Sequence, residues 1–236
     1  MRKFSRFTQT PPPKPTPYSS EKIIKIVPLK ALYIPIPKVA CSSVKRAIAN
    51  LLTIEIPLDG ADIHRANFPV VDRSELHKYD NYWKFCFVRN PWDRLVSCYS
   101  EKIKPDKNFF GTTNSFSHGV HKGLLKYGVF EANMPFDEFL KAVSSIPDHE
   151  ADQHFRSQHT FLTDKNGNLI TDFIGRFESI SQDFNEVFSK LGEPEIELPK
   201  SNKTHHQEYR QHYTDDLLSI FEKRYSKDIE LFGYHF

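Results

Sequence analysis

The chain has 236 residues, of which 39% are hydrophobic and 14% aromatic, so it is long enough for one well-packed domain and short for two. Its 32 basic and 30 acidic residues leave a formal net charge of +2, which excludes the strong positive field that draws proteins to nucleic acids or membranes. No stretch approaches the ~20 apolar residues that cross a bilayer, and the three cysteines show no C-x-x-C spacing. We therefore expect a soluble protein of a reducing compartment, the cytoplasm, without a transmembrane segment, a disulfide framework or a zinc site.

The N-terminal segment differs in composition from the rest of the chain. It contains the run TPPPKPTP, whose prolines favour an extended polyproline conformation over packing into a core. We expect residues 1–20 to form a tail and residues 21–236 to form the folded domain.

A strand, a loop and a helix are predicted between residues 32 and 52. A β-type apolar run over residues 32–36 stops at a proline, and apolar residues then return at helical spacing. Ser42 or Ser43 is the predicted N-cap, which leaves the other hydroxyl and the first N–H groups of the helix to meet an anion. Lys38 would reach over that anion. Because the first 50 residues contain no glycine, a Walker-type ATP loop is not expected.

The same layout returns between residues 83 and 103. Residues 83–88 indicate a buried strand, and Asn90-Pro91 begins a helix with an apolar stripe. Arg89 follows the strand, at the end where open α/β sheets bind ligands. A guanidinium there can take a phosphate bidentately, and Ser97, about two turns into the helix, offers a hydroxyl. Two such sites predict a ligand with phosphates at both of its ends.

The remaining elements complete the predicted domain. Residues 104–134 form a long stretch of weak periodicity, a candidate lid over a substrate. Apolar spacing predicts three more helices, and one dipeptide predicts a hairpin turn; these lie at residues 136–143, 180–191 and 217–225 and at Asn166-Gly167. Together the elements predict a three-layer α/β/α domain around a central parallel sheet.

Five segments of the chain carry a family resemblance. PKVACSS at 37–43 is followed about 50 residues later by FVRNPWDRLVS, and then by HFRSQ, DFIGRFESI and the C-terminal YSKDIELFGYHF. These segments resemble sulfotransferases that use 3′-phosphoadenosine 5′-phosphosulfate (PAPS). The nearest likeness is to the carbohydrate sulfotransferases that include the chondroitin and dermatan 4-O-enzymes, with heparan sulfate 2-O-sulfotransferase more distant. The resemblance covers roughly residues 28–236.

The resemblance implies a P-loop, nucleotide-kinase-like fold and transfer of the sulfuryl group from PAPS to a hydroxyl of a carbohydrate, without a metal ion. Matching positions imply that the 5′-phosphosulfate is held by Lys38, Val39, Ala40, Cys41, Ser42 and Ser43. Arg89 and Ser97 are implied to hold the 3′-phosphate, and Lys203 and Thr204 fall where the family closes a loop over the nucleotide. Golgi members of the group carry a membrane anchor, so a Golgi location would apply here only if an anchor had been removed.

The catalytic base is the least constrained role. Histidine suits the removal of the acceptor's proton because its unperturbed pKa lies near neutrality. His64 is the predicted base together with Lys38 as the catalytic cation, since His64 lies between the two donor motifs, where relatives such as the heparan 2-O-enzyme place their catalytic histidine. His77 and Glu101 are alternatives. Four further histidines are candidates for lining an acceptor cleft: His118, His121, His154 and His159.

Other interpretations stay open for these residues. The serines can be helix caps alone, Arg89 an ion-pair partner, and Arg94 a structural residue. Cys41 can be a reactive thiol at a helix start or a small packing residue. Two rival functions also remain: a phosphoryl-transferring kinase, which would depend on Mg²⁺ and ATP, and a non-catalytic module that binds a nucleotide or a glycan.

Overall fold

The computed structural model describes residues 22–56, 63–103, 115–194, 196–198 and 209–236. The predicted tail and the candidate nucleotide residues Lys203 and Thr204 lie outside these ranges. The described residues form a five-stranded sheet in the order β3-β1-β2-β4-β7, with β1 at Lys22–Ile26, β2 at Ala31–Ile34, β3 at Val70–Asp72, β4 at Trp83–Val88 and β7 at Phe173–Arg176.

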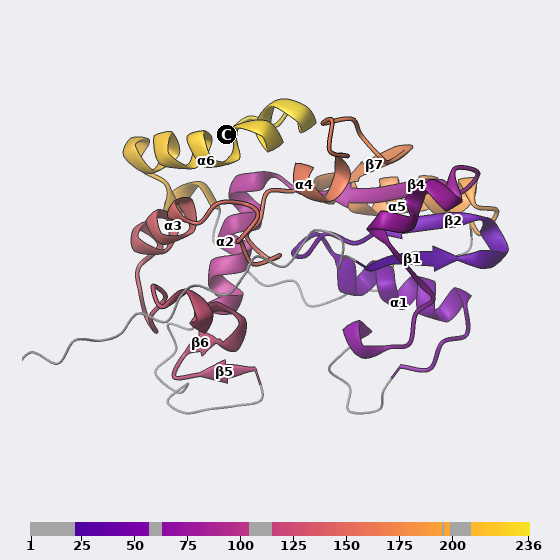
Figure 1. Ribbon diagram of the computed structural model, residues 1–236, viewed down its shortest axis with the longest axis horizontal. Helices are drawn as coiled ribbons and strands as arrows, with labels where there is room; N and C mark the ends of the chain where they lie inside the picture. Colours follow the sequence, from indigo (N-terminus) through magenta and orange to yellow (C-terminus); the bar gives the residue numbers. More distant parts are fainter. Residues whose placement is uncertain (1–21, 57–62, 104–114, 195, 199–208) are drawn as a thin grey trace, which may run out of the picture.

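Helices flank the sheet and extend beyond one end of it (Figure 1). The α-helices are α1 (Cys41–Leu51), α2 (Pro91–Lys102), α3 (Phe136–Ser145), α4 (His159–Leu162), α5 (Ile180–Lys190) and α6 (Asp215–Phe232). Figure 1 shows the sheet on the right with α1 below it, and α2, α3 and the small hairpin of β5 (Phe116–Ser117) and β6 (Val120–His121) on the left. None of the helices in the described ranges is long and apolar enough to cross a membrane.

The sheet is mixed, which corrects part of the predicted fold class. Strands β2, β4 and β7 are parallel, as expected, but β1 is antiparallel to both β2 and β3. Only the short 3₁₀ turn η2 (Val27–Leu29) and Lys30 separate β1 from β2. Since a parallel pair needs a crossover of a dozen or more residues, this connection permits only antiparallel pairing. The α/β class is confirmed, and the expected parallel sheet is found for β2, β4 and β7 but does not extend to β1 and β3.

The three parallel strands end at the same edge of the sheet. Aromatic side chains pack together on these strands. The rings of Tyr33 and Phe85 are stacked at a centroid distance of 5.3 Å, and the ring centroid of Phe87 is 6.4 Å from that of Tyr33. Phe87 pairs across the ladder with Gly175, where an added Cβ would lie 2.5 Å from the Phe87 ring. The strand β7 therefore needs glycine at this position so that β4 can keep its aromatic core.

The helices that the sequence predicted are present near their predicted bounds. Helix α2 begins at Pro91, and the Asn90 side chain accepts from the N–H groups of Trp92 and Asp93, as an N-cap does. Helix α6 is longer than predicted and ends at Phe232; the next residue, Gly233, is its C-cap, with a left-handed φ of 61°.

The predicted Asn166-Gly167 turn is present, but a helix and not a strand precedes it. Thr163 and Leu169 form one antiparallel bridge around the turn, and Gly167 has a φ of 87°. The residues before the turn form helix α4 instead. Asp228 of α6 accepts hydrogen bonds from the N–H groups at the start of α4, at 2.7 and 2.8 Å, and so stabilises a helix there.

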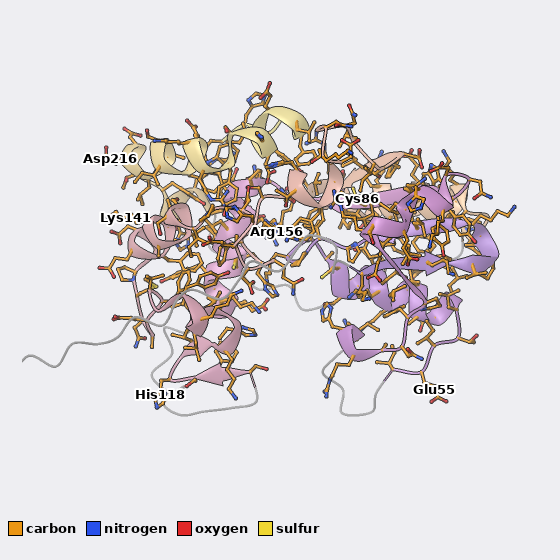
Figure 2. All side chains as sticks on the ribbon, in the orientation of Figure 1. Glu55, Cys86, His118, Lys141, Arg156 and Asp216 are labelled. Atoms are coloured by element: carbon orange, nitrogen blue, oxygen red, sulfur yellow. The ribbon has the colours of Figure 1, made fainter. Side chains whose placement is uncertain are left out.

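The stretch predicted as a lid is described only from residue 115. There it contains the β5–β6 hairpin and the 3₁₀ helix η5 (Lys122–Tyr127). Figure 2 shows His118 at the outer end of this hairpin, and Arg156 near the middle of the molecule.

Candidate active site

The loop between β2 and α1 turns through unusual backbone conformations. Lys38 and Ala40 have φ values of 70° and 49°, in the left-handed region that residues with side chains seldom adopt. The Ala40 carbonyl accepts hydrogen bonds from Ser43 and Val44 and so starts α1 at Cys41. Tight turns of this kind can direct successive N–H groups toward one side, where an anion can bind.

The predicted N-cap role of the two serines is wrong. Among the described residues no side chain caps α1, because the helix starts two or three residues earlier than expected and Ala40 occupies the cap position. Ser42 and Ser43 therefore lie inside the first turn. The Ser42 hydroxyl is engaged elsewhere, whereas Ser43 is buried, with 4% of its surface exposed.

His64 lies beside this loop, in the 3₁₀ helix η3 (Ile63–Arg65). Its Nε2 is 3.0 Å from the Ser42 hydroxyl oxygen, and its Nδ1 is 3.1 Å from Nζ of Lys45. A lysine ammonium only donates hydrogen bonds, so Nδ1 accepts from it and the proton of the neutral ring lies on Nε2. The structure thus brings the predicted base to the loop between β2 and α1, with its basic nitrogen directed at a lysine.

Arg89 follows β4 and is held on several sides. Its Nε donates to Asp93 at 2.8 Å, its Nη1 donates to the Lys38 carbonyl at 3.0 Å, and its guanidinium lies 4.2 Å over the Phe177 ring. The side chain amide of Gln158 bonds both the N–H and the carbonyl of Arg89. The contact with Lys38 joins the two sequence motifs directly.

Two other residues of α2 are buried at the site. Ser97 is 2% exposed, so a phosphate reaches its hydroxyl only after neighbouring side chains move. Arg94 donates to the carbonyls of Pro37, Gln153 and Arg156, at 2.8 to 3.0 Å. These bonds confirm the structural interpretation of Arg94, which ties α2 to the loop that follows β2.

Lys38 extends along α2 and pairs with Glu101, which also pairs with Lys102 at 2.9 Å. Burial by itself would raise the pKa of Glu101, but the two lysines outweigh burial and lower this pKa to about 2. Glu101 is therefore ionised at neutral pH and is a weak base. Its position beside Lys38 makes it a counter-ion of the proposed catalytic cation.

The remaining candidates are placed as follows. Burial raises the pKa of the Cys41 thiol, although Lys45 and Lys38 act in the opposite direction, which favours the packing role over a reactive thiol. His77 lies in a different place, where it lines a cleft of about 1440 Å³ together with His159 and Lys227. Its Nδ1 is 3.0 Å from the Ser74 carbonyl oxygen.

Several contacts at the site were absent from the sequence predictions. Asp93 stands four residues after Arg89, a spacing that favours an ion pair on a helix and offered a usable signal. Gln158, Phe177 and Lys102 reach the site from distant segments or from the far end of α2. The spacing of residues along the chain does not predict contacts between such distant positions.

Loops at the ends of neighbouring parallel strands, one leading into a helix N-terminus and one carrying a buried arginine, are typical of α/β proteins that bind phosphorylated ligands. A family model described as the sulfotransferase family matches residues 28–235. The chain therefore belongs to the sulfotransferase family, which confirms the resemblance seen in the sequence.

Curated relatives agree with this placement. Carbohydrate sulfotransferase 14 of Danio rerio is 28% identical over 228 residues, which are 86% of this chain and 59% of the relative. Carbohydrate sulfotransferase 8 of Homo sapiens is 28% identical over 77% of this chain and 45% of its own length. An uncharacterized protein of Archaeoglobus fulgidus is 31% identical over 50% of this chain and 73% of its own. The chain thus spans less than two thirds of these carbohydrate sulfotransferases, and no solved structure matches it significantly.

Proposed function

We propose that the protein transfers the sulfuryl group of PAPS to a hydroxyl of a carbohydrate, on a P-loop-type, three-layer α/β/α fold of the nucleotide-kinase kind. The observation that carries the proposal is the hydrogen bond from Arg89 to the Lys38 carbonyl, which joins the two motifs at the ends of β2 and β4. A ligand with phosphates at both ends spans such a pair of loops. Family membership and the names of the relatives support the reaction and the acceptor class.

In this proposal the donor binds along the edge formed by the parallel strands. The loop of Lys38, Val39, Ala40, Cys41, Ser42 and Ser43 receives the 5′-phosphosulfate through backbone N–H groups and the Ser42 hydroxyl. Arg89 and Ser97 receive the 3′-phosphate. For this, Arg89 exchanges part of its hydrogen bonding to Asp93 for bonds to the phosphate. Lys203 and Thr204 remain proposed nucleotide contacts by position alone.

The proposed chemistry places Lys38 at the breaking bond. Negative charge grows on the 5′-phosphate oxygen as it separates from sulfur, and an ammonium at that point stabilises the transition state. Lys38 is paired with Glu101, and Glu101 keeps Lys102 as a partner when Lys38 turns to the phosphate. His64, the base proposed from sequence position, touches the same loop through Ser42.

The location of the protein is also a proposal. The three cysteines, Cys41, Cys86 and Cys98, are free thiols, and Cys86 and Cys98 are buried. Free buried thiols are common in a reducing compartment, which supports the cytoplasm.

The test is incubation of the purified protein with ³⁵S-labelled PAPS and a panel of desulfated polysaccharides, in buffer with EDTA and again with added Mg²⁺. We expect label to enter at least one polysaccharide, with adenosine 3′,5′-bisphosphate as the other product, at the same rate in both buffers. Parallel incubations with γ-labelled ATP and Mg²⁺ test the kinase alternative. Phosphoryl transfer there, with no sulfuryl transfer from PAPS, contradicts the proposal.

A further inference from the structure

Six ionisable side chains gather along and beyond the C-terminal end of α2. We call them the α2-end cluster: Lys38, Glu101, Lys102, His121, Asp152 and His154. Lys102 is 4% exposed, and its ammonium is 2.9 Å from Glu101. Lys102 also helps to keep the pKa of Asp152 below its usual range, against the effect of burial and together with the bonds from His154. Arg94 donates to the carbonyls of Pro37 and Gln153, each at 3.0 Å, and so holds the segment of Asp152 and His154 beside the loop that carries Lys38.

Within the α2-end cluster, Asp152 and His154 form an oriented pair. Nδ1 of His154 is 2.6 Å from Oδ1 of Asp152, and the His154 backbone N–H donates to the same oxygen at 3.0 Å. An ionised carboxylate only accepts hydrogen bonds, so Nδ1 carries the proton and the lone pair of the neutral ring lies on Nε2. The two side chains are 20% and 16% exposed, which holds the ring in one direction and still leaves it accessible.

His121 completes the surroundings of this pair. Its ring centroid is 6.1 Å from that of His154, and its Nδ1 accepts from the Gly123 N–H at 3.2 Å. Burial, followed by the charges of Lys102 and His154, lowers the pKa of His121. A neutral His121 with its proton on Nε2 can donate a hydrogen bond to an acceptor oxygen, and it competes little for the proton.

The other candidate bases are less suited to accept a proton. Nδ1 of His64 receives a hydrogen bond from Lys45, so its lone pair is engaged by a cation. Glu101 has a pKa of about 2, too low for an effective base near neutral pH. His77 lies in the cleft with Lys227, apart from Lys38. In contrast, Nε2 of His154 carries the lone pair of the neutral ring, because the proton lies on Nδ1 toward Asp152. The residue also belongs to the same cluster as Lys38.

We propose that His154 is the catalytic base and that Asp152 is its positioning residue, an inference that rests on the function proposed above. Nε2 of His154 takes the proton of the acceptor hydroxyl while that oxygen forms its bond to sulfur. The bond from sulfur to the 5′-phosphate oxygen breaks, and its electron pair leaves on the phosphate, where Lys38 neutralises the charge. The proton on His154 passes to water after the products leave.

The experiment compares His154→Ala and His154→Gln with the wild type, using ³⁵S-labelled PAPS and the same panel of desulfated polysaccharides. We expect kcat to fall about 10²- to 10⁴-fold in both variants. Affinity for adenosine 3′,5′-bisphosphate and the Tm should stay near the wild-type values. Added imidazole should restore part of the activity of His154→Ala, because it supplies a base that a packing residue would not need. His154→Gln keeps a hydrogen-bond donor toward Asp152. It therefore controls for an activity loss in His154→Ala that is caused by misfolding.

Two further variants sharpen the test. Asp152→Asn should lower kcat less than His154→Ala and leave the KM for PAPS unchanged, as expected for a residue that orients the base. His149→Ala is the matched control from the same connection, since His149 is 56% exposed and pairs only loosely with Glu150, at 3.5 Å. It should keep full activity.

Each outcome bears on one of the two proposals. A wild type that transfers no sulfuryl group to any polysaccharide overturns the proposed function, and the assignment of His154 falls with it. An active wild type with an active His154→Gln overturns the assignment alone. The assignment is also overturned if activity and Tm fall together without imidazole rescue, or if His64→Ala loses the activity that His154→Ala retains.

Discussion

Lys38 has two competing partners in the proposed reaction: Glu101, with which it pairs in the structure, and the phosphate oxygen that becomes charged as the S–O bond breaks. The pairing positions the ammonium on α2 before the donor arrives. Glu101 retains a second cation, Lys102, so the transfer of Lys38 from carboxylate to phosphate leaves no uncompensated charge.

Lys38→Ala should therefore act on turnover. We expect kcat to fall on the order of 10²-fold or more, because the lost ammonium stabilises charge that appears only in the transition state. The Kd of adenosine 3′,5′-bisphosphate should change only a few-fold. Steady-state kinetics and calorimetry measure the two effects, with exposed Lys165→Ala as the control. Turnover within a few-fold of wild type would show that Lys38 only binds.

The depressed pKa of Glu101, about 2, makes its charge a source of stability. In the unfolded chain a glutamate titrates at about 4.3, so the stabilisation is complete above that pH and is lost as the pH falls toward 2. Because the side chain is 42% exposed, solvent screening limits the contribution to about 1 kcal/mol.

Glu101→Gln should therefore be less stable than wild type by about that amount at pH 7, and the difference should shrink between pH 4.5 and pH 2. Urea unfolding at several pH values measures it. The control is Glu186→Gln, exposed on α5, which should follow the wild-type curve throughout. A difference that stays constant down to pH 2 contradicts the ion-pair explanation.

At the scale of the elements, the pairing of β4 with β7 supports the site. Phe87 lies two residues before Arg89 and pairs with Gly175 across the ladder. Its ring centroid is 6.2 Å from that of Phe85. A Cβ at position 175 would clash with the Phe87 ring, which must then shift.

Gly175→Ala should destabilise the protein by about 1–3 kcal/mol, the usual cost of overpacking a core. Chemical denaturation measures the loss. The double variant Gly175→Ala, Phe87→Leu tests the cause, because a smaller side chain at position 87 makes room for the new methyl group. We expect the double variant to be more stable than the sum of the single effects predicts. Simple additivity would mean that the strain lies elsewhere.

At the scale of the whole molecule, the proposed donor connects two strand–loop–helix units. In the proposed function the loop after β2 receives one phosphate and the region of Arg89 the other, so a ligand with both phosphates would hold together two units that already meet in the bond from Arg89 to the Lys38 carbonyl. Stabilisation by such a ligand grows with its concentration over Kd, by about 2.7 kcal/mol at a hundredfold excess.

Adenosine 3′,5′-bisphosphate should accordingly bind at least about tenfold more tightly than AMP, since AMP lacks the partner of Arg89 and Ser97 and each charge-assisted bond contributes about 1.5–3 kcal/mol. Calorimetry gives the two Kd values, and the rise in Tm at equal ligand concentrations gives an independent ranking. Equal affinities would remove the assignment of the 3′-phosphate site.

Local sequence determined the features that depend on residues close together in the chain. Apolar spacing and the Asn90-Pro91 pair define α2, because a cap and a buried stripe act within one helix. Lys38 and Arg89 each follow a short apolar run that predicts a strand, so local pattern also places both residues at strand ends. Chain order therefore predicted the α/β class and the two loops of the candidate site.

Tertiary structure decided the contacts between residues that are distant in the chain. The antiparallel β1, the Gln158 bonds to Arg89 and the ion pair of Lys38 with Glu101 join residues whose own neighbours carry no sign of the partner. The pairing of Asp152 with His154 is local, but its place near Lys102 depends on how α2 packs. Long-range packing, which periodicity and capping do not encode, brings the segment of Asp152 and His154 to the loop of Lys38 through the bonds of Arg94 to Pro37 and Gln153.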